Sequence, residues 1–228
     1  MSLTAFWEGT IIASIANSVA RCTSEYSSET RQWTRHHYFV NGGDGREGVA
    51  TFAGGHWLPG AAMVAVFHDV HSKRILKYSP EWVRDRFFSG CPQYQHLLAE
   101  QACFPHLALS VNGVVEHRVT AAFWSVAESI KAADDWDGIL SNGADLVSRE
   151  LQGRFAMDSV LDEYATTSSQ SDLIRSLFVR KMESMPGQVI IMKPEMDILR
   201  RGSLSEDALS ECLAGLSEVG IAHQSESI

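Results

Sequence analysis

The chain has 228 residues, of which 45% are hydrophobic and 21% are charged, and its net charge is −9. This composition is ordinary for a folded globular protein and excludes disorder across the whole chain. The Lys and Arg residues are scattered and outnumbered, which argues against nucleic-acid binding, because neutralising phosphates needs clustered cations.

The N-terminal residues predict a helix followed by an antiparallel meander. Residues 3–21 place apolar side chains at helical spacing. Residues 36–40 are aromatic and β-branched and run into Asn41-Gly42, a strong turn signal. Residues 49–52 and 62–70 are the candidate partner strands, so we expect at least three antiparallel strands in this part of the chain.

The middle of the chain predicts two short helices and a second hairpin. Pro80, preceded by Ser79, is typical of a first helical position, and Pro92 opens the next helix. Residues 107–111 and 114–119 are then expected to form two strands around a turn.

From Thr120 onward the pattern is mainly helical. Thr120 can cap a helix that bears Phe123, Ala127 and Ile130. Residues 189–192 form a continuous apolar run, which is typical of a strand buried on both faces. Further helices are expected over 144–151, over 157–165, after a Ser171 cap, and after the capping box formed by Ser203 and Glu206.

Together these elements predict an α+β fold: an antiparallel-rich sheet with helices packed mainly on one face and a helical C-terminal half. A single composite domain over residues 1–228 is favoured. The alternative divides it into a β-rich part, 1–115, and a mostly helical part, 116–228. The longest apolar run, about 58–67, is too short to span a bilayer, so no membrane association is expected.

Four widely spaced cysteines, with no Cys-x-x-Cys, predict reduced thiols in a cytoplasmic protein. The charge is uneven along the chain. The first 114 residues carry nine Lys or Arg and nine Asp or Glu, whereas the last 114 carry ten and nineteen. The acidic excess therefore belongs to the C-terminal half, and a polar site is expected in the N-terminal half.

The histidines supply the main candidate site, since seven of the nine lie in the first half. Imidazole and carboxylate groups suit a divalent transition metal such as zinc or manganese, and the candidate ligands are His37, His68, Asp69 and His71. Asp44 or Glu47 would then be the base beside the metal. His68 and His71 point apart on a continuous strand and converge only if the strand ends at His68. The alternative is that these histidines are structural.

Three further patterns carry less specific signals. Cys103 with His106 resembles a nucleophile and base only in residue type, and a buried thiol is the alternative. Residues 43–48 match the letters Gly-x-Gly-x-x-Gly, but a strand is expected next, which favours a hairpin turn. The acidic residues of 134–138 do not fit a calcium loop and favour a solvated turn.

Trp57, on a glycine-flanked loop, and Arg46 are candidate ligand-binding residues at the mouth of a pocket between the sheet and the helices. The absence of a familiar catalytic motif favours an interaction or accessory protein without catalytic activity, with a protein partner or self-association as a homodimer. The alternative is a metal-dependent hydrolase that uses the His/Asp cluster. Whether the chain is an enzyme stays open at this level.

Overall fold

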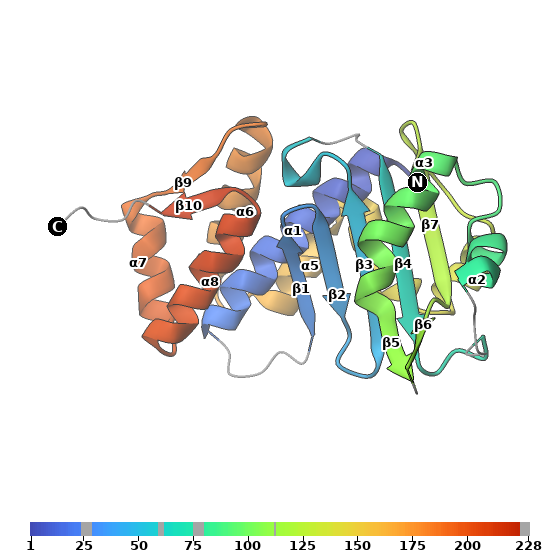
Figure 1. Cartoon of the computed structure of the whole chain (residues 1–228). Helices are drawn as coiled ribbons and strands as arrows, with labels where there is room; N and C mark the ends of the chain where they lie inside the picture. Colours follow the sequence, from blue (N-terminus) through green and yellow to red (C-terminus); the bar gives the residue numbers. More distant parts are fainter. Residues whose placement is uncertain (24–28, 59–61, 75–79, 112, 224–228) are drawn as a thin grey trace.

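The computed structural model describes residues 1–23, 29–58, 62–74, 80–111 and 113–223. Its centre is a six-stranded antiparallel sheet in the order β1-β2-β3-β4-β7-β8 (Figure 1). The strands are β1 (Thr30–Thr34), β2 (His37–Asn41), β3 (Arg46–Phe52), β4 (Met63–Asp69), β7 (Ala121–Val126) and β8 (Ser129–Lys131). The predicted α+β class and the β2-β3-β4 meander are therefore confirmed.

The helices occupy both ends of the chain and the connection after β4. They are α1 (Leu3–Thr23), α2 (Pro80–Phe87), α3 (Gln93–Leu98), α4 (Trp136–Leu140), α5 (Met157–Tyr164), α6 (Ser168–Glu183), α7 (Lys193–Gly202) and α8 (Glu206–Glu218). Short 3₁₀ or π turns lie between them: η1 (Gly55–Trp57), η2 (Ala99–Cys103), η3 (Phe104–Leu107), η4 (Ala144–Val147) and η5 (Glu150–Ala156). In the described part of the chain, no helix has the length and apolar character needed to cross a bilayer.

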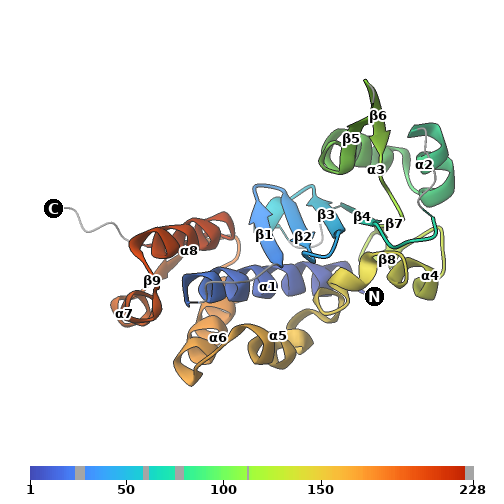
Figure 2. The same ribbon diagram turned by 90° about the horizontal axis from the view of Figure 1, so that it is seen from below.

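Helix α1 is the centre of the hydrophobic core. It lies between the inner face of the sheet and the helices α5 and α6, while α8 packs against α1 beside β1 (Figure 2). Alternate strand residues point at it, so Phe6 packs against Phe52 and Phe123 with ring centroids 5.7 and 5.4 Å apart. The apolar cluster built on this helix extends from Leu3 to Ile221 and draws on both halves of the chain.

The outer face of the sheet, the face turned away from α1, is covered over only part of its width. Helices α2 and α3 with η2 and η3 pack against β4 and β7, where Val64, Val66 and Trp124 join a second apolar cluster. The buried Gln95 side chain anchors α3, since its Nε2 donates to the Ser125 carbonyl oxygen at 2.5 Å. The outer-face residues of β1 and β2 are exposed or half-buried.

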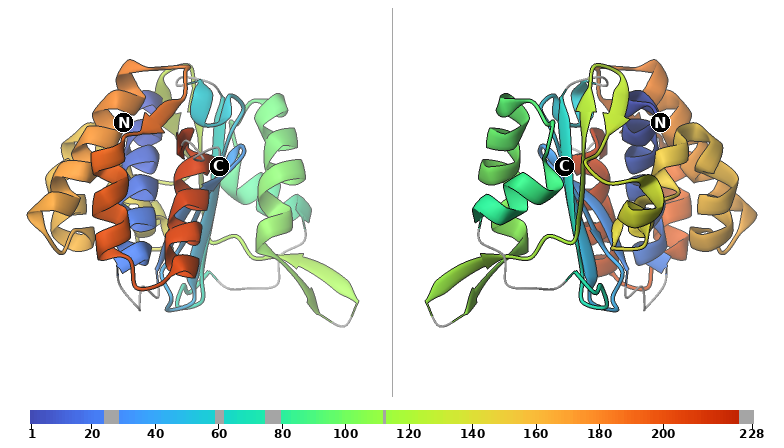
Figure 3. Two further views of the ribbon diagram at one scale, coloured as in Figure 1. Left: turned by 90° about the vertical axis from the view of Figure 1, so that its left-hand side faces the viewer. Right: turned by 90° about the vertical axis from the view of Figure 1, so that its right-hand side faces the viewer.

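Two small sheets complete the fold. Strands β5 (Ala108–Val111) and β6 (Val114–His117) form the second predicted hairpin, which extends away from the body of the molecule (Figure 3). Strands β9 (Val189–Ile191) and β10 (Ile221–His223) pair in parallel beside α6 and α8. The prediction that residues 189–192 are buried on both faces is wrong, because Ile190 is 37% exposed in this two-stranded sheet.

The predicted helix after Thr120 is also wrong, since residues 121–131 form the β7–β8 hairpin. Phe123 faces α1 and Trp124 faces the outer cluster, and this period of two satisfies both cores at once. Helix α6 begins three residues before the expected Ser171 cap, at a Thr167 side chain that accepts from the Gln170 N–H. The Ser79 cap proposed for α2 lies outside the described residues.

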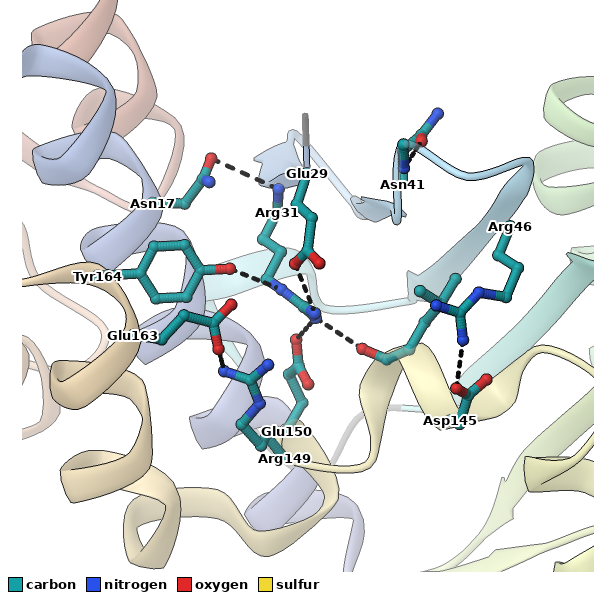
Figure 4. Close-up of polar contacts among 12 residues, drawn as sticks. Asn17, Glu29, Arg31, Asn41, Arg46, Asp145, Arg149, Glu150, Glu163 and Tyr164 are labelled. Carbon is teal, nitrogen blue, oxygen red and sulfur yellow. Dashed lines mark hydrogen bonds and ion pairs between the residues drawn. The ribbon is translucent and has the colours of Figure 1, made fainter. Parts of the chain in front are cut away.

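A buried ion pair joins β1 to η5 beneath the sheet (Figure 4). The Arg31 guanidinium donates to Glu150 Oε1 at 2.5 Å, to the Leu146 carbonyl at 2.6 Å and to the Tyr164 hydroxyl at 2.8 Å. The Tyr38 hydroxyl also donates to Glu150 Oε1, at 2.6 Å. Arg31 and Glu150 are 4% and 2% exposed, so this pair is sealed from water.

Candidate functional site

A row of four polar side chains crosses the outer face of the sheet. Thr30 is directly opposite Asn41, Asn41 is opposite Glu47, and Glu47 is opposite His68. Directly opposite residues share a face of the sheet and their Cβ atoms lie about 5 Å apart. We call this set, Thr30, Asn41, Glu47 and His68, the polar row.

Glu47 and His68, at the more buried end of the polar row, both have shifted pKa values. Burial raises the pKa of Glu47, and the positive charge of Arg118 opposes that shift. Burial, with Arg118 second, lowers the pKa of His68. His68 is only 3% exposed, and neither of its ring nitrogens has a hydrogen-bond partner within the described part of the chain. The imidazole is therefore neutral near pH 7 and keeps an unused donor and an unused acceptor.

The rings of His37, Phe39 and His106 form a group beside the polar row. The His106 ring, from η3, meets the Phe39 ring edge-on, with centroids 4.7 Å apart, and lies 5.2 Å from the His37 ring. His37 Nδ1 is hydrogen-bonded to Thr51 Oγ1 at 2.8 Å. Burial lowers the pKa of both His37 and His106. These rings give the region an apolar and uncharged wall.

A cavity of about 260 Å³ lies between the polar row and this wall. Its polar lining includes the half-buried Glu47 and the exposed Asn41, and its apolar lining includes Phe39 and Leu107. The lining residues are Thr30, Gln32, Phe39, Val40, Asn41, Glu47, Gly48, Val49, His106 and Leu107. A concave site with convergent polar groups and apolar walls is the usual form of a small-molecule site. We call it the outer-face cavity.

The four predicted metal ligands are not gathered at one point. His37 is level with Thr51 and Val64, whereas His68 is level with Glu47, which is four residues away along β3. Four strand residues span about 13 Å, and β3 also lies between the two histidines. No group of three or more His, Cys, Asp or Glu side chains is placed to hold a metal ion among the residues that the structure describes. Metal binding stays a prediction.

Asp69 and His71 form hydrogen bonds at the C-terminal end of β4. Asp69 Oδ1 accepts from the His71 N–H at 2.7 Å, and His71 Nε2 contacts the Asp44 carbonyl oxygen at 3.1 Å. The strand ends at Asp69, one residue later than the converging arrangement requires. His68 and Asp69 are adjacent on a strand and therefore point to opposite faces.

The two predicted ligand-binding residues are also apart. Arg46 begins β3 and forms ion pairs with Asp44 and with Asp145 (Figure 4). Trp57 follows the opposite end of β3, in η1, and its ring lies 4.3 Å from the Lys181 ammonium. The structure thus does not place Arg46 and Trp57 at the mouth of one pocket.

The glycine-rich segment and the acidic cluster, two other candidates from the sequence, form a turn and ion pairs. Residues 43–48 lie at the predicted hairpin turn: the turn has positive φ at Gly43 and Gly45, and β3 begins at Arg46. Asp134 pairs with Arg74 and Arg86. The side chain of Cys103 lies outside the described residues.

Sequence reasoning named Glu47 and His106 only within other hypotheses and missed Thr30, Asn41 and Gln32. The signal was present in part, since residues 37, 39 and 41 share a face in any strand. The partner strand β1 was not predicted, so the register that completes the polar row was not accessible. Comparisons with known proteins add no further assignment: no family model, curated protein or solved structure matches the chain.

Proposed function

We propose that this protein is a binding protein and that the outer-face cavity holds a small, uncharged polar molecule. The observation that carries the proposal is the polar row. Three of its side chains, Thr30, Asn41 and Glu47, line the outer-face cavity on an incompletely covered sheet face. The buried His68 lies opposite Glu47 at the end of the row and is not part of the lining. A ligand that pairs with the hydroxyl, amide and carboxyl groups of the lining satisfies their hydrogen-bonding capacity.

The side chains that line the outer-face cavity indicate which class of ligand fits it. Phe39, His106 and Leu107 offer an apolar surface for a ring or a short hydrocarbon part. Thr30, Asn41 and Glu47 face it with hydroxyl, amide and carboxyl groups. Glu47 accepts hydrogen bonds, so the ligand must present donors such as hydroxyl, amide or ring N–H groups. Sugars and nucleobases have this combination of features.

The test is ligand-observed NMR with a panel of monosaccharides, nucleobases and free amino acids, followed by calorimetry on the compounds that bind. Replacing Glu47 by Gln removes one charged acceptor and is expected to weaken binding about 10- to 100-fold, since such a hydrogen bond contributes about 1.5–3 kcal/mol. Glu211→Gln, on the exposed side of α8, is the matched control and should bind as the wild type does.

Binding that is equal in wild type, Glu47→Gln and Glu211→Gln would place the ligand elsewhere and refute the site. If no compound of the panel binds, the proposed ligand class is wrong.

The other functions expected from the sequence remain predictions. No observation in the described residues favours a metal-dependent hydrolase over a binding protein. Self-association is tested by light scattering on the purified chain. A mass twice that of the chain, unchanged on dilution, would establish the homodimer.

A further inference from the structure

A fully buried lysine lies on the α1 side of the sheet, away from the outer-face cavity. Lys181, on α6, has 0% of its surface exposed. Its Nζ lies 4.3 Å from the centroid of the Trp57 ring and donates to the Gly187 carbonyl oxygen at 3.4 Å. It has no ion pair with a carboxylate in the described part of the chain. Buried lysines are almost always paired, so this amine is unusual.

The His56 imidazole is a second titratable group close to Lys181 Nζ and the Trp57 ring. His56 is 7% exposed, and neither of its ring nitrogens has a hydrogen-bond partner among the described residues. A Cβ atom added to Gly220 would lie 2.9 Å from Lys181 Nζ, 3.0 Å from the Trp57 ring and 3.2 Å from His56 Nε2. The amine and the imidazole therefore face one point, which only a glycine leaves free.

The surroundings favour the uncharged forms of both groups. Burial lowers the pKa of Lys181 to about 8. Burial, followed by the charge of Lys181, lowers the pKa of His56 to about 4, while the Arg35 backbone opposes this shift and His36 adds to it. Near pH 7.5 the imidazole is neutral, and about a quarter of the amine is unprotonated, against about 0.1% for an ordinary lysine.

The Trp57 indole lies over the amine. Trp57 is 38% exposed, and its ring is tilted by 46° against the His56 ring, with centroids 4.1 Å apart. The route of access that we consider is a change in the rotamer of this exposed indole, which requires no movement of α6. The inner wall is the Trp33 ring, which meets His56 edge-on at 6.3 Å. An opened site is thus lined by aromatic rings and suits an uncharged, apolar ligand.

We propose that Lys181 is a nucleophilic amine that forms an imine with small uncharged aldehydes admitted beneath the Trp57 indole. The neutral amine attacks the carbonyl carbon, so the C–N bond forms while the C=O π bond breaks, and His56 Nε2 carries one proton from nitrogen to the oxygen to give the neutral carbinolamine. His56 Nε2 then carries the second N–H proton to the hydroxyl group of the carbinolamine. The C–O bond then breaks, water leaves, and the imine remains, so one amine and one aldehyde give one imine and one water.

The test is reductive trapping on the full chain. The protein is incubated with propionaldehyde or benzaldehyde and cyanoborohydride at pH 7.5, and peptide mapping by mass spectrometry follows each lysine with time. The exposed Lys131 and Lys193 are internal references. We expect Lys181 to be alkylated at least about tenfold faster than either reference, and more than tenfold more slowly in His56→Gln, with the references unchanged.

Trp57→Ala separates reactivity from access. It should raise the rate at Lys181 further, because it removes the cover. If Lys181 stays unmodified in both wild type and Trp57→Ala while the references react, the amine is only a buried structural cation and the proposal fails. Labelling in Trp57→Ala but not in wild type would equally overturn it, since the indole would then seal the amine permanently.

Discussion

Replacing Glu150 by Gln should destabilise the protein strongly, because it leaves the Arg31 guanidinium buried without its carboxylate. Glu150 is the one acceptor that binds both Arg31 and the Tyr38 hydroxyl among the described contacts. Breaking a buried pair costs about 3–5 kcal/mol through the uncompensated charge. The amide still accepts a hydrogen bond, and the half-exposed Glu29 stays 3.3 Å from Arg31. We therefore expect a loss near the lower limit, about 3 kcal/mol.

The assay is urea unfolding at pH 7 followed by circular dichroism. With a slope of about 2 kcal/mol per M, a loss of about 3 kcal/mol lowers the midpoint by about 1.5 M. Asp158→Asn is the matched control, because its ion pair with Arg175 is exposed and such pairs contribute less than about 1 kcal/mol. The double variant Arg31→Met with Glu150→Leu should recover most of the loss, since no fully buried charge is left unpaired. A midpoint change in Glu150→Gln no larger than that of the control would refute the reasoning.

Three further outcomes are expected. Gly9→Ala should cost several kcal/mol in urea unfolding, because its Cβ would lie 2.0 Å from the Glu150 backbone oxygen, whereas Gly90→Ala meets no atom and should cost only the ~1 kcal/mol of its positive φ. Stability should rise as the pH increases from about 8 to about 10.4, because the unfolded chain keeps the Lys181 proton over that range while the folded chain loses it, and Lys181→Met should abolish the rise. Stability should fall as the pH drops from about 6.5 to 4, where the unfolded chain takes up the His56 proton first, and His56→Phe should reduce the fall.

The local elements were predictable where one core determined the pattern. Helix α1 and the β2-β3-β4 meander follow from periodicity and from the Asn41-Gly42 turn. The β7–β8 hairpin was mistaken for a helix because Phe123, Ala127 and Ile130 have helical spacing after a possible Thr120 cap. Two cores, one on each side of β7, favour the alternating pattern of a strand over that spacing.

The candidate site was less predictable because it depends on register between strands far apart in the sequence. Thr30 and His68 are end members of one row, yet β2 and β3 separate them. A one-residue slip in any of these pairings would send a member of the row into the α1 core. The proximity of Lys181 to His56 is likewise invisible in the sequence, since it depends on α6 packing near η1.

The central position of α1 also constrains how the protein is made. This helix is synthesised before the elements that enclose it, which include η5, α6 and finally α8, whose last residue is Glu218. Because 17 of its residues are buried in the finished fold, its apolar surface stays exposed until α8 has been synthesised. Nascent chains that stop before Glu206 should therefore aggregate or recruit chaperones, and chains that extend beyond α8 should lose that association.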